Sequence, residues 1–292
     1  MKLPYYPGCT LKANAKHFED SAIKALSKLD YELEEMKDWV CCGTVFSLTN
    51  DDLMLHISSI RNLLRAEEQN FDRLVVLCSM CYNTLNRSNK FITENPENLE
   101  KLNDFMYKEN IEYNGNLDIV HLLSVIKDEI TFKEMNKKLS KPLKNLKIGA
   151  YYGCLLVRPQ EFAIDNFEAP TIMEDLIENL EGKSIDFPYK LECCGAYQTI
   201  TKKDISVKRA YEILKSAQES GCEAVVTSCP LCAYNLDFLQ EEIEKEFGNY
   251  FPIPVFYFTE LMALALDGNW QHEWTQLHKI NPEPLLKEKN LI

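Results

Sequence analysis

The chain has 292 residues, and 46% of them are hydrophobic, which is enough for the cores of one large domain or two ordinary ones. Its 32 basic and 45 acidic side chains give a formal net charge of −13, which repels nucleic acid backbones and anionic lipids and argues against both as partners. The first residues, MKLPYYPGCTLK, lack the apolar segment of a signal peptide, and the longest apolar stretch, 251–266, is too short and too interrupted to span a bilayer. We therefore expect a cytoplasmic protein whose eleven cysteines serve metal or redox chemistry rather than disulfides.

Short apolar runs alternate along the chain with longer segments of helical spacing. The runs predict buried strands, or strand-to-helix passages, at residues 3–6, 74–77, 118–126, 148–152, 224–227 and 255–266. Helices with charged outer faces are expected at residues 10–29, 51–69, 203–220 and 232–247. The polar stretch 86–116 has no counterpart later in the chain, and we expect an inserted helical excursion there. This alternation of strands and helices predicts an α/β fold.

The cysteines reveal an internal repeat. With Cys222 set aside, the other ten form two quintets, each made of a single cysteine, an adjacent pair and a C-x-x-C motif. Gaps of 31 and 35 residues separate these units in the first quintet, and gaps of 38 and 34 separate them in the second. The quintets are Cys9, Cys41, Cys42, Cys78 and Cys81, and Cys154, Cys193, Cys194, Cys229 and Cys232.

The residues around the cysteines repeat as well. YYPGC at 5–9 matches YYGC at 151–154, glycine follows each cysteine pair, and Tyr-Asn closely follows each C-x-x-C motif. These matches predict two tandem domains, 1–130 and 148–292, joined by a lysine-rich linker at 131–147. We expect each domain to be a small Rossmann-like α/β unit with an irregular pocket that carries the cysteines.

The arrangement of the cysteines favours a metal cluster over simpler sites. Each C-x-x-C motif follows a strand and precedes a helix, where the amides at the helix N-terminus favour the thiolate that binds soft metals. Adjacent side chains in an extended segment diverge, so the two thiolates of a pair more naturally bind different metal atoms. A structural zinc ion is complete with four ligands, and a fifth cysteine in each half exceeds that requirement. The pattern therefore indicates a multi-iron cluster with an unusual ligand set.

The pattern C-x31-CC-x35-C-x2-C, its second copy, and the glycine after each pair resemble the duplicated CCG domain of the B-type subunit of heterodisulfide reductase from methanogens and its relatives. The resemblance covers nearly the whole chain, and the 34-residue gap of the second copy is one residue shorter than usual. It implies one noncubane [4Fe-4S] cluster per domain, the first bound by Cys9, Cys41, Cys42, Cys78 and Cys81 and the second by Cys154, Cys193, Cys194, Cys229 and Cys232. No further catalytic residue is implied.

The resemblance also implies a reaction and a set of partners. The substrate would be the mixed disulfide of coenzyme M and coenzyme B, with one sulfur captured by an iron of each cluster and the S–S bond cleaved between them. Two electrons, delivered singly, and two protons would release the thiols. Because the sequence has no binding motif for cubane clusters, flavin or nucleotide, electrons would come from the ferredoxin-like, C-type subunit of heterodisulfide reductase, its flavin-containing, A-type subunit, and a hydrogenase or formate dehydrogenase behind them.

Two alternatives remain open. One is a CCG iron–sulfur subunit of fumarate, lactate or glycolate metabolism, although such relatives commonly carry a ferredoxin domain or keep the full quintet in only one half. The intact double quintet without such a domain favours heterodisulfide reductase. The other alternative is a non-catalytic zinc-binding scaffold, which the fifth cysteine of each quintet disfavours.

Other residues near the motifs carry weaker expectations. Cys222 is expected to be a small buried hydrophobe, and Tyr5, Tyr6, Tyr151 and Tyr152 to pack in the core. Gly8, Gly43, Gly153 and Gly195 are expected to let the backbone approach a cluster. The five histidines are expected at the surface or at helix caps, with His17 alone worth testing as a proton donor. Cations that could hold the coenzyme anions, each more simply a solvated surface residue, are Lys12, Lys16, Arg158, Lys202 and Lys203.

Overall fold

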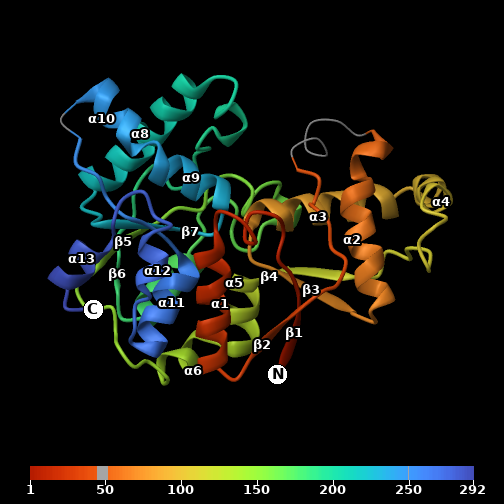
Figure 1. Ribbon diagram of the computed structural model, residues 1–292, viewed down its shortest axis with the longest axis horizontal. Coiled ribbons are helices and arrows are strands. Elements are labelled where there is room, and N and C mark those ends of the chain that lie inside the picture. Colours follow the sequence, from red (N-terminus) through yellow and green to blue (C-terminus); the bar gives the residue numbers. More distant parts are fainter. Residues whose placement is uncertain (45–51, 249) are drawn as a thin grey trace.

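The computed structural model describes residues 1–44, 52–248 and 250–292, which form two α/β halves side by side (Figure 1). Each half contains a four-stranded sheet in which every pairing is parallel, with orders β2-β1-β3-β4 and β6-β5-β7-β8. The strands are β1 (Lys2–Tyr6), β2 (Glu32–Glu35), β3 (Arg73–Val76), β4 (Asp118–His121), β5 (Lys147–Ala150), β6 (Lys183–Ser184), β7 (Ala224–Thr227) and β8 (Val255–Tyr257). The duplicated, Rossmann-like α/β fold expected from the sequence is confirmed.

Helices connect the strands in both halves. In the first half they are α1 (Lys16–Lys28), α2 (Ile57–Glu68), α3 (Ser79–Thr93), α4 (Pro96–Phe105) and α5 (Leu122–Val125) with a π-helical turn (Ile126–Ile130). Helix α6 (Phe132–Asn136) lies in the segment 131–147 between the halves. In the second half they are α7 (Ile172–Asn179), α8 (Lys203–Glu219), α9 (Pro230–Phe238), α10 (Gln240–Phe247), α11 (Phe258–Asp267), α12 (His272–Thr275) and α13 (Glu283–Glu288). Short 3-10 helices lie at Leu53–His56, Gln160–Phe162 and Ala196–Gln198.

The boundaries of several helices differ from the sequence expectations. The helix expected over 10–29 begins only at Lys16, because residues 9–15 form turns in which the carbonyl of Thr10 accepts two backbone N–H groups. The helix expected over 232–247 is two helices that meet at Leu239. Within the expected helix 51–69 the chain forms a 3-10 turn and then α2, while residue 51 lies outside the described residues. The excursion at 86–116 contains the end of α3 and all of α4.

The two halves pack through helices that belong to opposite halves. Helix α11 is apolar and buried along its length because it lies against α1 of the first half, as Figure 1 shows. Phe18 of α1 stacks on Tyr257 with ring centroids 4.2 Å apart, and the hydroxyls of Ser21 and Thr259 are 2.6 Å apart. Helix α6, which lies in the segment between the halves, packs on α7 of the second half. The tandem repeat therefore shares one core between its halves.

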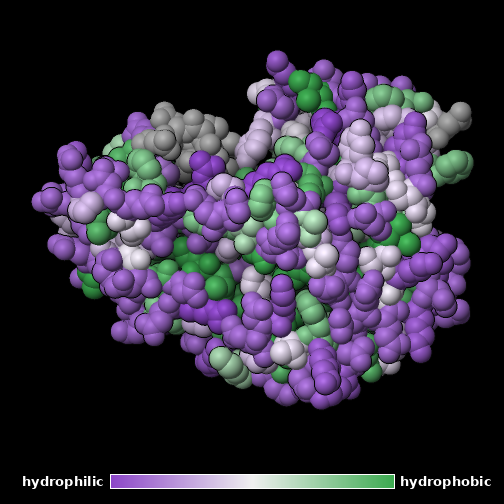
Figure 2. All heavy atoms as spheres, turned by 180° about the vertical axis from the view of Figure 1, so that it is seen from behind, coloured by the Kyte–Doolittle hydropathy of each residue, from purple (hydrophilic) through white to green (hydrophobic). Residues whose placement is uncertain are grey.

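The outer surface is largely polar on the face that Figure 2 draws. Figure 2 shows hydrophilic residues over most of one face, with hydrophobic residues only in small patches. Among the described residues, no helix combines the length and apolar character needed to cross a membrane.

Candidate metal centre

Both quintets lie at the carboxyl ends of the parallel strands. The two central strands of each sheet are β1 and β3 in the first half and β5 and β7 in the second. From one central strand the chain continues to one edge of the sheet, and from the other it continues to the opposite edge. Open α/β sheets bind ligands at the carboxyl ends of the strands, at the point where the direction of the connections changes in this way. The lone cysteine follows the first of these strands and the C-x-x-C motif follows the second. The pairing of Tyr6 with Val76, and of Ala150 with Val226, brings the two loops side by side.

The first quintet forms a connected row of thiols. Cys9 donates to Cys41 with their Sγ atoms 3.9 Å apart. Cys42 accepts hydrogen bonds from Cys41 and Cys81, and Cys81 in turn contacts Cys78. Two thiolates bound to one tetrahedral metal at about 2.3 Å would lie about 3.8 Å apart, so this spacing suits a shared metal ion.

The second quintet repeats the row in the same order. Cys193 forms hydrogen bonds with Cys154 and Cys194. Cys194 donates a hydrogen bond to Cys232, and the Sγ atoms of these two residues are 3.5 Å apart. Cys232 contacts Cys229. All eleven cysteines are free thiols.

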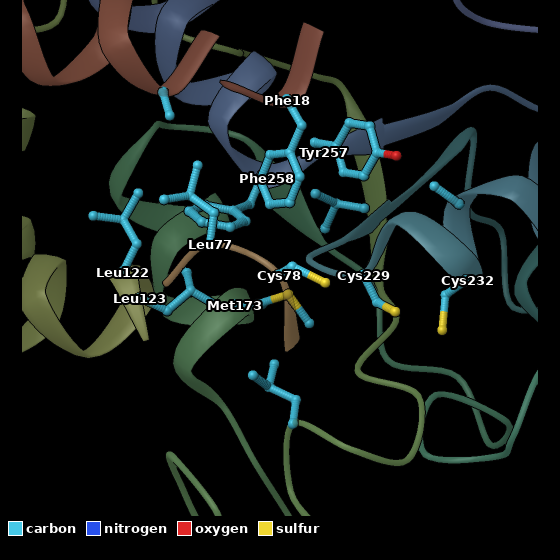
Figure 3. Close-up of a cluster of buried hydrophobic side chains, with 14 of the residues drawn as sticks. Phe18, Leu77, Cys78, Leu122, Leu123, Met173, Cys229, Cys232, Tyr257 and Phe258 are labelled. Atoms are coloured by element: carbon cyan, nitrogen blue, oxygen red, sulfur yellow. The ribbon is translucent and has the colours of Figure 1, made fainter. Parts of the chain in front are cut away.

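The two rows join into one. Cys78 and Cys229, the first cysteine of each C-x-x-C motif, hydrogen-bond to each other across the boundary between the halves. Figure 3 shows the sulfurs of Cys78, Cys229 and Cys232 following one another below Tyr257. Ser79 and Ser228 reinforce this junction through hydroxyls 2.5 Å apart. The ten thiols thus form one continuous row from Cys9 to Cys154, in which the second quintet follows the first in reversed order. We call this order palindromic.

Hydrogen bonds from neighbouring thiols lower the pKa of three cysteines in the row. Hydrogen bonds from Cys154 and Cys194, together with the Gly195 N–H, lower the pKa of Cys193 to about 2. Bonds from Cys41 and Cys81 likewise lower the pKa of Cys42, and those from Cys232 and Cys78 lower that of Cys229. Cys229 is also the N-cap of α9 and accepts backbone N–H groups there, as expected for a C-x-x-C motif at a helix start.

Glycines allow the backbone to pass close to the sulfurs. The glycines beside each lone cysteine and each pair, at 8, 43, 153 and 195, all have positive φ. A Cβ on Gly8 would lie 3.0 Å from the Sγ of Cys81, and one on Gly153 would lie 3.2 Å from that of Cys232. The backbone therefore passes close to a cysteine sulfur at these two positions, and the expected approach to a cluster stays a prediction. Two matching sites whose only donors are thiolates suit iron–sulfur clusters. The five cysteines of each quintet would hold one cluster.

Side chains from three helices fix the loops that carry the cysteine pairs. Asn62 of α2 accepts from the N–H of Val40 and donates to its carbonyl. In the second half, Arg209 of α8 donates to the carbonyl of Cys193, and Asn235 of α9 donates to that of Cys194. Sequence reasoning missed Asn62 and Arg209, but the repeated Tyr-Asn after each C-x-x-C motif is a signal that marks Asn235.

The first half also helps to enclose the second quintet. Asn83, the counterpart of Asn235, donates to the carbonyls of Leu155 and Arg158 in the loop after Cys154. Met80 and Ser79 line the pocket that contains Cys154, Cys193, Cys194, Cys229 and Cys232. The hydroxyl of Tyr197 lies 3.6 Å from the sulfur of Met80.

A separate cavity of about 510 Å³ opens near the junction of the two rows. Its lining includes Thr10, next to Cys9, and Pro230 and Leu231, which lie between Cys229 and Cys232. His17, His278 and Asp237 line it as well, whereas the described lining residues include no lysine or arginine.

The other sequence expectations have mixed outcomes. Cys222 and the four tyrosines are buried as expected, but the expectation that the histidines lie at the surface or at helix caps is wrong for His17, His56 and His278, which are buried and make no side-chain cap. His121 is buried too, but its side chain caps α5, which confirms the expectation for that residue. Burial lowers the pKa of His17 to about 4, which leaves it neutral near pH 7.

Two of the five suggested cations already have carboxylate partners. Lys12 pairs with Glu19 and Glu35, and Lys203 pairs with Glu242. Arg158 is exposed and donates to the carbonyl of Leu191.

Comparison with known proteins identifies the class of this centre. The chain matches the CCG cysteine-rich domain twice, over residues 3–86 and 148–237, and it belongs to that family. It is 30% identical over 263 residues to the 8-methylmenaquinol:fumarate reductase membrane anchor subunit of Wolinella succinogenes, covering 90% of this chain and 91% of that protein.

A second relative is the B-type subunit of the ferredoxin/F420H2-dependent CoB-CoM heterodisulfide reductase of Methanosarcina acetivorans, 27% identical over 270 residues, 91% of this chain and 89% of that protein. These relatives, with the clustered thiols, support an iron–sulfur subunit of a redox complex. A crystal structure of a hypothetical protein from Helicobacter pylori shares the fold, with a TM-score of 0.72 and 13% identity. The match covers 95% of this chain and 51% of that one.

Proposed function

We propose that this chain is the disulfide-reducing, B-type subunit of a heterodisulfide reductase, with the mixed disulfide of coenzyme M and coenzyme B as its substrate. The observation that carries the proposal is the junction between Cys78 and Cys229, which places the two ligand sets end to end rather than at opposite sides of the molecule. Two redox centres in contact suit a reaction that needs two electrons at one bond.

The reaction balances with two electrons and two protons for each disulfide, R–S–S–R′ + 2e⁻ + 2H⁺ giving R–SH and R′–SH. Bound noncubane [4Fe-4S] clusters would supply the electrons, one from each half. The chain's own contribution is to hold ten thiolates in fixed positions and to exclude water with the tyrosines behind the lone cysteines, Tyr5, Tyr6, Tyr151 and Tyr152, which are buried. His17 stays a weak candidate for moving a proton, because its neutral ring lines the neighbouring cavity.

The proposal includes partners and a location. Electrons would arrive one at a time from the ferredoxin-like, C-type subunit with its cubane clusters, fed by the flavin-containing, A-type subunit and a hydrogenase or formate dehydrogenase. Cys9 and Cys41 are exposed, so the first quintet is the natural side for docking such a partner. We place the complex in the cytoplasm, as expected from the sequence.

A second candidate is an electron-transfer subunit of a quinol:fumarate reductase. The 30% identity to the Wolinella succinogenes protein favours it. So does the absence of lysine and arginine from the described lining of the large cavity, since coenzyme M and coenzyme B are anions that need cationic partners.

The two candidates differ in the reaction that the purified protein performs. We would purify the chain anaerobically, measure iron and acid-labile sulfide, and assay reduction of the coenzyme M–coenzyme B disulfide by reduced viologen. About eight iron and eight sulfide ions per chain with disulfide reduction would support the first candidate. The same iron content without that activity, together with a co-purifying flavoprotein that reduces fumarate, would replace it with the second. About two zinc ions without iron would overturn both and leave the scaffold alternative.

A further inference from the structure

A buried cluster of three titratable residues lies where α1 meets the second half. His17 comes from α1, Glu260 from α11, and His278 from the segment after α12. Their relative exposures are 4%, 0% and 9%, and their nearest ligand atoms all lie within 4.8 Å of one another. None of the three is part of either cysteine quintet. Two imidazoles and a carboxylate at this spacing form a donor set for a divalent transition metal.

Supporting hydrogen bonds hold Glu260 and His278 in a ligand-like orientation. One carboxylate oxygen of Glu260 accepts the N–H of Tyr257 at 2.8 Å, which leaves the other oxygen directed at the Nε2 of His278, 2.9 Å away. The second ring nitrogen of His278 bonds to the backbone of Val255. Metal-binding histidines characteristically donate their second N–H to such a carbonyl, because this bond fixes the ring and its tautomer.

His17 lacks the partner that a buried nitrogen normally has. Its Nδ1 is buried and makes no hydrogen bond to any described residue. Leaving a buried polar atom unpaired costs about 1–3 kcal/mol. The ring lies 4.9 Å from that of His278, measured between centroids, so the residue with the unpaired nitrogen belongs to the same cluster. A bound cation would complete its coordination.

The cluster also has access to solvent and to ligands. His17 and His278 both line the cavity of about 510 Å³, together with the buried carboxylate of Asp237. Asp237 is held by the backbone N–H groups of Lys279 and Ile280 at 2.6 and 3.0 Å, which keeps it beside His278. A metal ion with three protein ligands would therefore have its fourth position open toward this cavity.

We propose that His17, Glu260 and His278 bind one divalent transition metal ion of the zinc class, separate from the iron–sulfur centre. The ion joins the two halves, since one ligand comes from the first half and two from the second. Four donors at about 2.0–2.1 Å from a tetrahedral ion are about 3.4 Å apart, so Glu260 and His278 need to separate only slightly from their present 2.9 Å. Binding displaces the proton that these two residues share. The remaining coordination position takes water or a small anion from the cavity.

The test uses the full chain with its iron–sulfur centre loaded, so that the cysteines are occupied. The protein is equilibrated anaerobically with a small excess of Zn²⁺, desalted, and measured for zinc, iron and the zinc K-edge absorption spectrum. We expect about one retained zinc ion, with only nitrogen or oxygen neighbours at about 2.0 Å. Sulfur neighbours at about 2.3 Å would assign the zinc to cysteines and overturn the proposal.

His17→Gln is the informative variant, because the unpaired ring nitrogen contributes little to folding. We expect its zinc affinity to fall more than about tenfold, since even residues that only support a ligand change metal affinity by about 10- to 100-fold. Its iron content should match that of the parent protein. His272→Gln is the matched control, because His272 is exposed and pairs with Glu283 away from the cluster.

Thermal unfolding gives a second readout that is independent of metal analysis. Added Zn²⁺ should raise the unfolding temperature of the parent protein and of His272→Gln, but not that of His17→Gln, because a ligand stabilises only the state that binds it. Equal zinc retention or equal stabilisation in His17→Gln would overturn the proposal. These readouts do not involve disulfide or fumarate reduction, so they stand or fall independently of the proposed function.

Discussion

The two halves share one topology and one cysteine pattern, yet they surround their thiols differently. Cys9 and Cys41 of the first half are exposed, whereas their counterparts Cys154 and Cys193 are partly covered. The cover comes in part from the first half, whose Met80 lines the pocket of the second quintet. A duplicated ligand set has thus acquired one open and one enclosed environment without any change in its order of contacts.

The two equivalent asparagines show how this difference arises. Asn235 supports the second quintet from within its own half, through the carbonyl of Cys194. Asn83 does not serve the first quintet in the same way, because its amide crosses to the carbonyls of Leu155 and Arg158. Both asparagines therefore stabilise the second quintet, while Asn62 holds the pair loop of the first.

Removing the middle thiolate from either row should have the largest effect. Cys42 and Cys194 each contact two other cysteines, so Cys42→Ala and Cys194→Ala should each lose about four of about eight iron ions. Disulfide reduction should fall more than about a hundredfold in both, beyond the 10- to 100-fold loss that indirect changes at metal sites cause. Cys222→Ala is the control, since Cys222 lies outside both quintets. Full activity in either cysteine variant would contradict a mechanism that needs both halves.

Chelation should separate the open half from the enclosed one. An anaerobic chelator should remove iron in two phases, with the faster phase belonging to the first quintet because Cys9 and Cys41 are exposed. In Cys42→Ala only the slower phase should remain, and in Cys194→Ala only the faster one. Iron release in a single phase would show that the exposure of Cys9 and Cys41 does not govern access of the chelator.

Asn83→Ala should loosen the second quintet from a distance. The substitution leaves two carbonyls of the loop after Cys154 without their donor, and we expect the free energy of unfolding in urea to fall by about 1–3 kcal/mol. The slower phase of iron release should accelerate while the faster phase is unchanged. Asn86→Ala is the matched control, because Asn86 donates only to carbonyls of the first half, those of Tyr82 and Ile119. An equal effect of the two substitutions on the slower phase would show that the hydrogen bonds from Asn83 to the other half do not stabilise the second quintet.

The smallest effect is expected at the ion pairs between α1 and α11. Lys28 and Lys24 lie 2.7 and 3.1 Å from Asp267 and lower the pKa of its carboxyl group. The ion pairs therefore contribute to the free energy of unfolding above the ordinary carboxyl pKa of about 3.9, and this contribution is lost as pH falls through the lower pKa of Asp267 in the folded protein. Asp267→Asn should cost less than about 1 kcal/mol at neutral pH and should weaken the loss of stability in acid, measured by urea unfolding between pH 6 and 3. Identical pH profiles for the two proteins would assign no role to these pairs.

The contact between α6 and α7 gives a comparison for this last measurement. There the amide of Asn136 donates to the carbonyl of Asn179, and the bond carries no charge. Asn136→Ala should therefore lower stability by the same amount throughout that pH range.

The sequence predicts the repeated parts of this molecule better than the parts that differ. The spacing of the ten cysteines, their flanking glycines and the apolar runs before them predict the fold and the convergence of the thiols at the strand ends. The edge strands β2 and β6 could not be predicted, since β2 is polar and β6 has only two residues. The contact between Cys78 and Cys229 could not be predicted either, because it depends on how the halves pack. The same packing buries His278 beside Glu260, a pairing of residues 18 positions apart that no motif marks.

The palindromic order of the thiols has a consequence for the symmetry of the chain. A row that reads the same from both ends is what a twofold axis produces, whereas a simple translation would bring the end of one row to the beginning of the other. Two copies of a single domain related by such an axis would build the same row of ten thiols. Because both halves belong to one chain, each can have its own surroundings, one open and one enclosed, whereas identical protomers share one sequence.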